Sequence, residues 1–224
     1  MDLQSEPIQD IAHLGSVELL TPDLDGSVWY FRDVLGMSEA HRAEGSVYLR
    51  AYGDYALTTL KLTSAAQPGP GCISWRATSP QALQRRARAL EAAGYGLGWT
   101  NGDVGRGRAY RFRDPEGHTM EIYFDEEKYR APPEERSTLK NLPQKFSGRG
   151  AAVRRIDHLA LLAKDVAANR AFAENLLGFR LREQVLFNQG ATEIGSWLST
   201  SQIHHQLAYV ADVKAGSARL HHFS

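Results

Sequence analysis

Histidines gather in the last third of this 224-residue chain, where three short segments carry five of the eight. They are His158, the adjacent pair His204 and His205, and the adjacent pair His221 and His222. An imidazole titrates near neutral pH, so it can move protons during a reaction, and its neutral form is a common metal ligand. Neighbouring side chains of a strand project to opposite faces, so the two members of each pair are expected to point apart. A histidine on a strand is more often structural than ligating, so these positions need support from the fold.

An internal repeat indicates which elements position these segments. Residues 17–37 align without a gap on residues 159–179, at a constant offset of 142. Each copy begins with an apolar run typical of a strand, and apolar residues at helical spacing follow. Gly36 and Gly178 then stand where a helix commonly ends in a left-handed residue. The repeated unit is therefore predicted to be a strand, a helix and a tight exit. Within the first helix, Trp29 and Tyr30 are expected in the core.

A second kind of unit is predicted between the two copies. Ser79 is a typical helix N-cap between a strand and a helical pattern that runs from Gln81 to Ala93. His118 follows a turn at 114–117 and is expected to be a surface or turn residue that makes hydrogen bonds within the turn. The unit reads βαβββ, with strands at 71–77, 96–99, 107–113 and 119–125.

The predicted fold is α+β, built from paired βαβββ modules in two halves. Residues 11–125 form the N-terminal pair, and residues 126–152 are charged, contain three prolines and read as a linker. Residues 153–224 form the C-terminal half, whose fourth module begins at Arg219. A strand without partner strands cannot bury its face, so the fourth module is expected to be truncated.

The sequence RDPEGHTMEIY at 113–123, together with the module order, resembles the vicinal oxygen chelate (glyoxalase-like) superfamily. The segments around His158, His205 and His222 are similar to those of type I extradiol dioxygenases, the catechol 2,3-dioxygenases especially. That resemblance implies an enzyme that opens a catechol ring with O2 and a non-haem Fe(II), or Mn(II), and that assembles as a homo-oligomer. Two imidazoles and one carboxylate suit this chemistry, because they leave adjacent positions on the metal open.

The resemblance also implies roles for individual residues. His158 and His222 map to the two histidine ligands of the metal, and the third ligand, a glutamate, is expected beyond Ser224. His205 maps to the acid-base histidine that also contacts the substrate. Trp197 maps to an aromatic side chain that lines the ring pocket.

The repeat provides an internal test of these assignments. His158 corresponds to Ser16 in the first half, and His222 corresponds to Cys72. Glu121 keeps the carboxylate position, but Ser, Cys and Glu are a poor ligand set for Fe(II), so the N-terminal half is predicted to be a scaffold without metal. This set also argues against a glyoxalase-like metal lyase or isomerase. That class, and a small-molecule binding protein of the same fold, remain the alternatives.

Composition excludes several other classes of function. Lys plus Arg and Asp plus Glu both number 26, so no net field favours nucleic acid or an anionic membrane as a partner. Cys72 is the single cysteine, which excludes an internal disulfide framework and suits a reducing cytoplasm. No apolar run approaches the roughly 18 to 20 residues that span a bilayer. A cytoplasmic location is expected.

Overall fold

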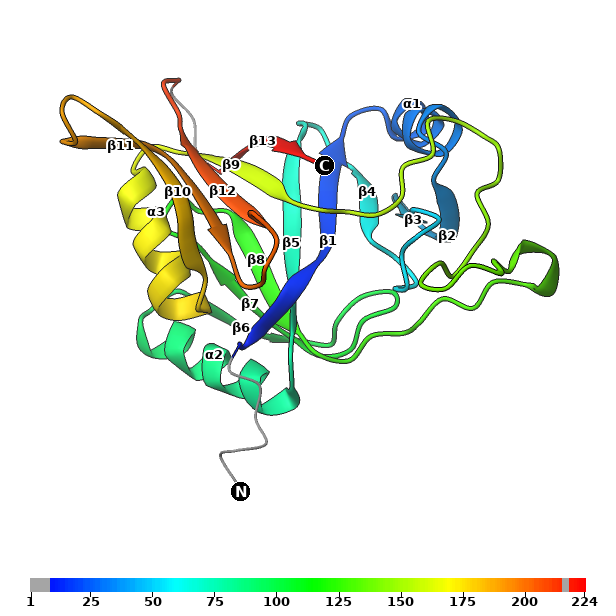
Figure 1. Ribbon diagram of the computed structural model, residues 1–224, viewed down its shortest axis with the longest axis horizontal. Helices are drawn as coiled ribbons and strands as arrows, with labels where there is room; N and C mark the ends of the chain where they lie inside the picture. The colour runs from blue at the N-terminus through cyan, green and yellow to red at the C-terminus, as the bar shows by residue number, and fades with distance from the viewer. Residues whose placement is uncertain (1–8, 215–217) are drawn as a thin grey trace.

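The computed structural model describes residues 9–214 and 218–224, and its first βαβββ module forms one half of a large mixed sheet (Figure 1). Asp23 caps the helix by accepting a hydrogen bond from the amide of Gly26 at 2.9 Å. The elements are β1 (Ile11–Thr21), α1 (Leu24–Trp29), the π-helical turn η2 (Tyr30–Val34), β2 (Ser38–Ala43), β3 (Ser46–Arg50) and β4 (Leu60–Ser64).

The second module completes this sheet. Ser79 caps the helix as predicted, since its side chain accepts from the amide of Ala82, and proline follows at the first helical position. The elements are β5 (Gly69–Ala77), α2 (Pro80–Ala92), β6 (Gly96–Thr100), β7 (Ala109–Arg113) and β8 (Thr119–Tyr123). The strand order is β2-β3-β4-β1-β5-β8-β7-β6, with the two modules joined by the antiparallel pair β1 and β5.

The third module repeats the first, and one further strand begins a fourth. Asp165 caps its helix through the amide of Ala168, as Asp23 does in the first copy. The elements are β9 (Leu159–Ala163), α3 (Val166–Phe172), the π-helical turn η4 (Ala173–Leu177), β10 (Arg180–Phe187), β11 (Thr192–Ser199), β12 (Leu207–Ala211) and β13 (Arg219–Phe223). Their order is β10-β11-β12-β9-β13, so the predicted architecture of paired βαβββ modules is confirmed.

Both repeated helices exit through left-handed glycines, as predicted, but their last turns are not α-helical. The last turn of each widens into a π-helix before Gly36 and Gly178, which have φ angles of 82° and 78°. In the first copy the amide of Leu35 bonds to the carbonyl of Tyr30, five residues back. The expectation that Trp29 and Tyr30 lie in the core is wrong, because this turn leaves them 59% and 46% exposed.

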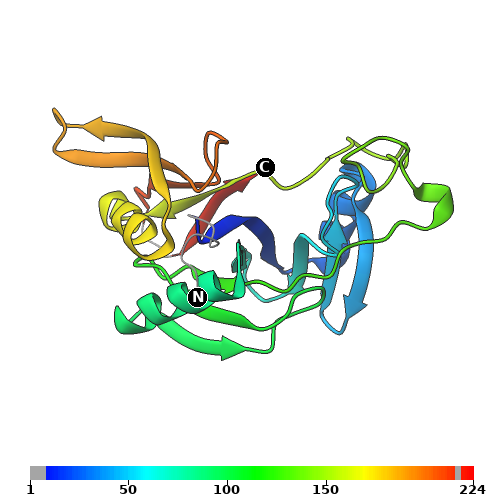
Figure 2. The same cartoon turned by 60° about the horizontal axis from the view of Figure 1, so that its bottom comes forward.

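The two sheets share one hydrophobic core, in which α2 and α3 lie side by side (Figure 2). Trp75 packs edge-on against Phe179 with ring centroids 5.0 Å apart, and Tyr95 packs on Phe172 at 4.8 Å. Arg86 of α2 also donates to the carbonyl of Leu176 at 2.9 Å. The second and third modules are therefore held together by packing as well as by the chain.

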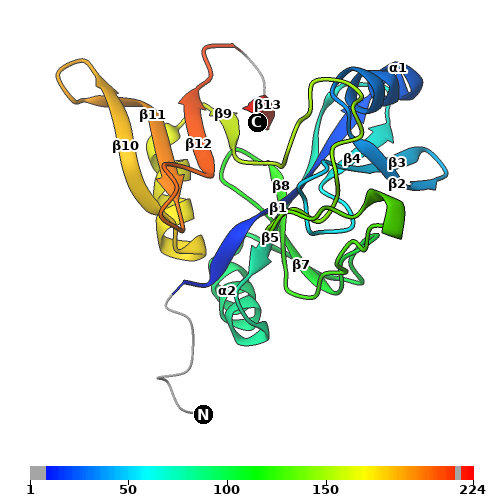
Figure 3. The same ribbon diagram turned by 45° about the vertical axis from the view of Figure 1, so that its right-hand side comes forward.

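The connecting segment runs along the outside of the first module before it returns to β9 (Figure 3). Its one regular element is the short 3-10 helix η3 (Pro133–Glu135). Buried Arg50 donates to Gln144 of this segment and lies 3.6 Å from the ring centre of Tyr129. Within the described residues, no helix is both long and apolar enough to cross a membrane.

Candidate metal centre

Strands β9 and β13 bring His158 and His222 together. His158 stands just before β9, where its carbonyl accepts from the amide of Ser224 at 2.9 Å and so continues the pairing with β13. His222 pairs with Ala160, two residues further along β9. The Nε2 atoms of the two imidazoles are 3.3 Å apart, and their rings are nearly perpendicular. An ion about 2.1 Å from each nitrogen fits this separation.

His205 completes a cluster of three imidazoles. It lies in the loop just before β12, and its ring centroid is 4.3 Å from that of His158. The next residue, Gln206, holds the loop in place: its amide donates to Leu198 and its carbonyl accepts from Leu159. The structure therefore gathers the three histidines singled out in the sequence at one end of β9.

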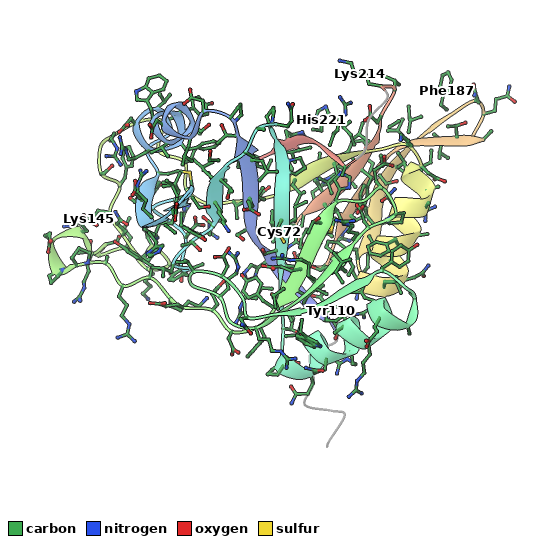
Figure 4. All side chains as sticks on the ribbon, turned by 180° about the vertical axis from the view of Figure 1, so that it is seen from behind. Cys72, Tyr110, Lys145, Phe187, Lys214 and His221 are labelled. Atoms are coloured by element: carbon green, nitrogen blue, oxygen red, sulfur yellow. The ribbon has the colours of Figure 1, made fainter. Side chains whose placement is uncertain are left out.

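The prediction that His204 and His221 point away from their neighbours is wrong. In each pair the two Nδ1 atoms are 2.7 Å apart, and the ring centroids are 5.0 Å apart. Strand alternation fails at His221 because the register of β13 shifts between Leu220 and His222. His204 precedes β12 and lies in a loop, where no alternation applies. Figure 4 labels His221 on β13.

Asp157 is a member of the site to which the sequence analysis gave no role. Its Oδ2 lies 2.8 Å from Nδ1 of His158. A carboxylate at this position accepts the Nδ1 proton and leaves Nε2, the atom that faces His222, free to bind a metal. The signal was its place directly before His158 in the chain.

Burial keeps two of these imidazoles in the neutral form. The pKa of His222 is lowered by loss of solvent and then by the nearby rings of His221 and His158. The pKa of His205 is lowered by the same two causes, with His158 the largest neighbour. Both side chains are therefore uncharged at neutral pH, the state in which imidazole can ligate a metal or accept a proton.

Trp197 lies on the same face of the sheet as His222. It pairs with Ala208, which pairs with Ala160, which in turn pairs with His222. Residues directly opposite one another across neighbouring strands project to the same face. The row therefore has an indole at one end, an imidazole at the other, and two methyl side chains between them.

The equivalent positions of the N-terminal half carry a different set of groups. Arg106 donates from Nη1 to the Ser16 hydroxyl at 2.7 Å, and its Nε lies 3.6 Å from Oε1 of buried Glu121. Cys72 is buried, which raises the pKa of its thiol far above the ordinary range. The guanidinium of Arg106 thus contacts both Ser16 and Glu121, which correspond to two of the predicted ligand positions of the C-terminal half.

The ligands present fit part of a non-haem metal site. Two imidazoles face a common point, which suits Fe(II) or Mn(II) as well as other divalent ions. Among residues 9–214 and 218–224, no group of three or more His, Cys, Asp or Glu side chains is arranged to hold a metal ion. The glutamate expected as third ligand stays a prediction.

The sequence profile of the Glyoxalase/Bleomycin resistance protein/Dioxygenase superfamily matches residues 11–122 and 155–224, the stretches that form the two sheets. The chain belongs to this superfamily. Metapyrocatechase of Geobacillus stearothermophilus is 45% identical to it over 217 residues, which cover 97% of this chain and 66% of that protein. Manganese-dependent 2,3-dihydroxybiphenyl 1,2-dioxygenase of Geobacillus genomosp. 3 is 36% identical, over 96% of this chain and 68% of that protein. The chain thus spans about two thirds of the length of the curated relatives it matches.

Solved structures of superfamily members share the fold. The 2,3-dioxygenase LapB from Pseudomonas sp. KL28 matches with a TM-score of 0.85 and 24% identity, over 97% of this chain and 75% of that one. Homoprotocatechuate 2,3-dioxygenase from Brevibacterium fuscum, in complex with 3,4-dihydroxyphenylacetate, matches with a TM-score of 0.81 and 24% identity, over 98% and 65% of the two chains. The resemblance inferred from the motifs is confirmed for the superfamily.

Proposed function

We propose that this chain belongs to an extradiol dioxygenase that uses a non-haem Fe(II), or Mn(II), and O2 to open a catechol beside its two hydroxyls. The observation that carries the proposal is the convergence of the His158 and His222 Nε2 atoms, 3.3 Å apart, beside His205. The relatives support it, because the two described above are named as a metapyrocatechase and a dihydroxybiphenyl dioxygenase.

His158 and His222 would hold the metal through Nε2, with Asp157 fixing the ring of His158. When bound, the metal supplies adjacent open positions for catechol and O2, and a path for electrons between them. We expect a carboxylate to complete the ligand set. The neutral state of His222, which follows from its lowered pKa, makes its nitrogen available without first losing a proton.

His205 would move protons at the substrate. Its ring lies against that of His158, so it borders the place where a catechol would meet the metal. Since burial lowers its pKa, the imidazole is uncharged at neutral pH and can take a proton from a catechol hydroxyl. Once protonated, it can return that proton to an oxygen later in the reaction. A single residue would then act first as base and then as acid.

Trp197 would form a wall of the substrate pocket. It shares a row with His222, and the small side chains of Ala160 and Ala208 lie between them. The indole offers a flat ring an aromatic partner for edge or stacked packing. This arrangement favours an aromatic substrate over a sugar or a phosphate.

The test is reconstitution of the gene product with Fe(II) without air, followed by catechol and air. We expect a yellow ring-fission product, followed by its visible absorbance. His205→Gln should lower kcat by about 10² to 10⁴ and flatten the pH profile, because general acid-base catalysis contributes that much. His41→Gln, on β2 of the N-terminal half, is the matched control and should change little. Absence of product from every catechol tried, with the protein folded and loaded with iron, would contradict the proposal.

We also propose that the protein associates with itself. Val185, Leu186 and Phe187 at the end of β10 are exposed apolar side chains, and Figure 4 labels Phe187 on the hairpin that leaves the body of the molecule. Sedimentation velocity tests this, and a monomer at every concentration would contradict it.

A further inference from the structure

One turn of the N-terminal half contacts three adjacent strands of the C-terminal sheet. This turn joins β7 to β8 and spans residues 114–118. Oε2 of Glu116 accepts from the amide of Lys164, just after β9, at 2.8 Å. Oδ2 of Asp114 accepts from the hydroxyl of Tyr209 on β12 at 3.0 Å. Nε2 of His118 lies 3.1 Å from the carbonyl oxygen of Arg219, the first residue of β13.

His118 is fully engaged within this turn. The prediction that it hydrogen-bonds within the turn is confirmed, since its amide and Nδ1 both contact Asp114, but it is buried, at 1% exposed, and is not a surface residue. Nδ1 lies 2.7 Å from Oδ2 of Asp114, and Nε2 faces the Arg219 carbonyl. A carboxylate and a carbonyl oxygen both accept, so each ring nitrogen of His118 faces a hydrogen-bond acceptor. Oδ1 of Asp114 also accepts from the amides of Gly117 and His118.

The strands held by the turn are those that carry the site. Tyr209 lies four residues after His205, and Arg219 lies three residues before His222. β9, which follows His158, pairs with β12 on one side and with β13 on the other. Asp114 therefore contacts β12 and His118 contacts β13, the two strands that flank β9.

We propose that His118 is a positioning residue: through its hydrogen bond to Arg219 it fixes β13 against β9, and so sets the separation of His158 and His222. This role rests on the proposed function, because it matters for chemistry only if these two histidines share a metal. The bond is shielded from water, because His118 is 1% exposed, and this makes it stronger than a bond at the surface.

Two conservative substitutions separate its two bonds. The amide nitrogen of asparagine lies near the place of Nδ1, so His118→Asn keeps a donor to Asp114 and loses the bond to Arg219. The amide nitrogen of glutamine lies near the place of Nε2, so His118→Gln keeps the donor to Arg219 and loses the one to Asp114. Hydrogen exchange of the β13 amides should quicken about tenfold more in the asparagine variant than in the glutamine variant, since only the asparagine variant loses the hydrogen bond to Arg219.

The affinity for Co(II) alone gives a second readout. We expect His118→Asn to raise the Kd by about 10-fold or more over His118→Gln, as is typical when a group behind a ligand is lost. A merely structural role would lower the melting temperature of both variants without separating them in either readout. Equal β13 exchange in the two variants would overturn the proposal. The proposed function fails in a different way, namely if His158→Ala leaves Co(II) affinity unchanged.

Tyr209→Phe serves as a third variant that keeps His118 intact. It removes only the hydroxyl that donates to Asp114, so amides of β12 should exchange faster while those of β13 stay slow. If neither His118 variant folds, this variant still decides the matter, because equally fast exchange in both strands would show that the turn does not hold β13 through His118.

Discussion

The two sheets have the same strand pairing, but the side chains at equivalent positions are very different. In the C-terminal sheet the row beside His222 consists of Ala160, Ala208 and Trp197. In the N-terminal sheet the equivalent row holds Glu18, Lys61 and Tyr48, and Glu18 accepts from the amide of Cys72 at 3.0 Å. Lys61 lies 2.9 Å from Asp103 and 3.4 Å from Glu18, so long charged side chains form ion pairs on the face where the C-terminal sheet has alanines.

This difference shows how the N-terminal copy of a module can serve as a scaffold while the C-terminal copy carries the candidate metal site. Buried charges are stable only when they are paired, and the N-terminal row pairs them within the protein. The C-terminal row has one imidazole, two methyl groups and an indole, so its imidazole is available to an ion. Figure 4 labels Cys72, at the position in the first sheet that corresponds to His222 in the second.

The largest effect is expected from alanine substitutions at the two equivalent positions, 222 and 72. His222→Ala should lower metal affinity by more than the roughly 10- to 100-fold that loss of an outer-shell partner causes, because a ligand is removed. Cys72→Ala is its repeat-related control and should leave affinity unchanged. Isothermal titration with Co(II) measures both. Equal losses would mean that the two halves do not differ as described.

The ion network of the N-terminal half can be broken at Arg106. Arg106→Met should destabilise the protein by about 3 kcal/mol, because buried Glu121 loses a cation that faces it. Ser74 and Arg111 still contact Glu121, which keeps the loss at the lower end of the range. Urea unfolding measures the change, and Arg106→Lys, which keeps the charge, should lose less. An unchanged midpoint in the methionine variant would contradict a stabilising role.

A smaller effect is expected from filling the C-terminal row. Ala208→Leu should raise the KM for catechol while Co(II) affinity stays the same, because the larger side chain displaces its row neighbours Trp197 and Ala160 and replaces no ligand. Overpacking should cost about 1–3 kcal/mol of stability. Steady-state kinetics and metal titration of one preparation give both quantities. An unchanged KM would remove this row from the pocket.

Much of the fold followed from the repeat, because strand and helix periods and the glycines at 36 and 178 are local signals. The same offsets that align the sequence also align the strand pairs, so Leu159 opposite Phe223 corresponds to Val17 opposite Ile73. This is why the sequence could predict that His158 and His222 approach each other. Their identity as ligands came from resemblance and remains a proposal.

The orientation of His221 and the burial of His118 could not be predicted from local sequence patterns. The orientation of His221 depends on a shift in strand register between Leu220 and His222, which the neighbouring residue types do not predict. The burial of His118 depends on Arg219, which is 101 residues away in the chain. Contacts of this length are set by how the two halves pack, and a repeat within one chain does not encode the packing between its copies.

The shared core of α2 and α3 has a consequence for how the molecule loses its structure. Aromatic pairs such as Trp75 with Phe179 join the second module to the third, so neither sheet can open without exposing part of the other. Unfolding should then be a single cooperative event for both halves. A metal ion bound by the C-terminal sheet would then, by mass action, also stabilise the strands of the N-terminal sheet, which it does not contact.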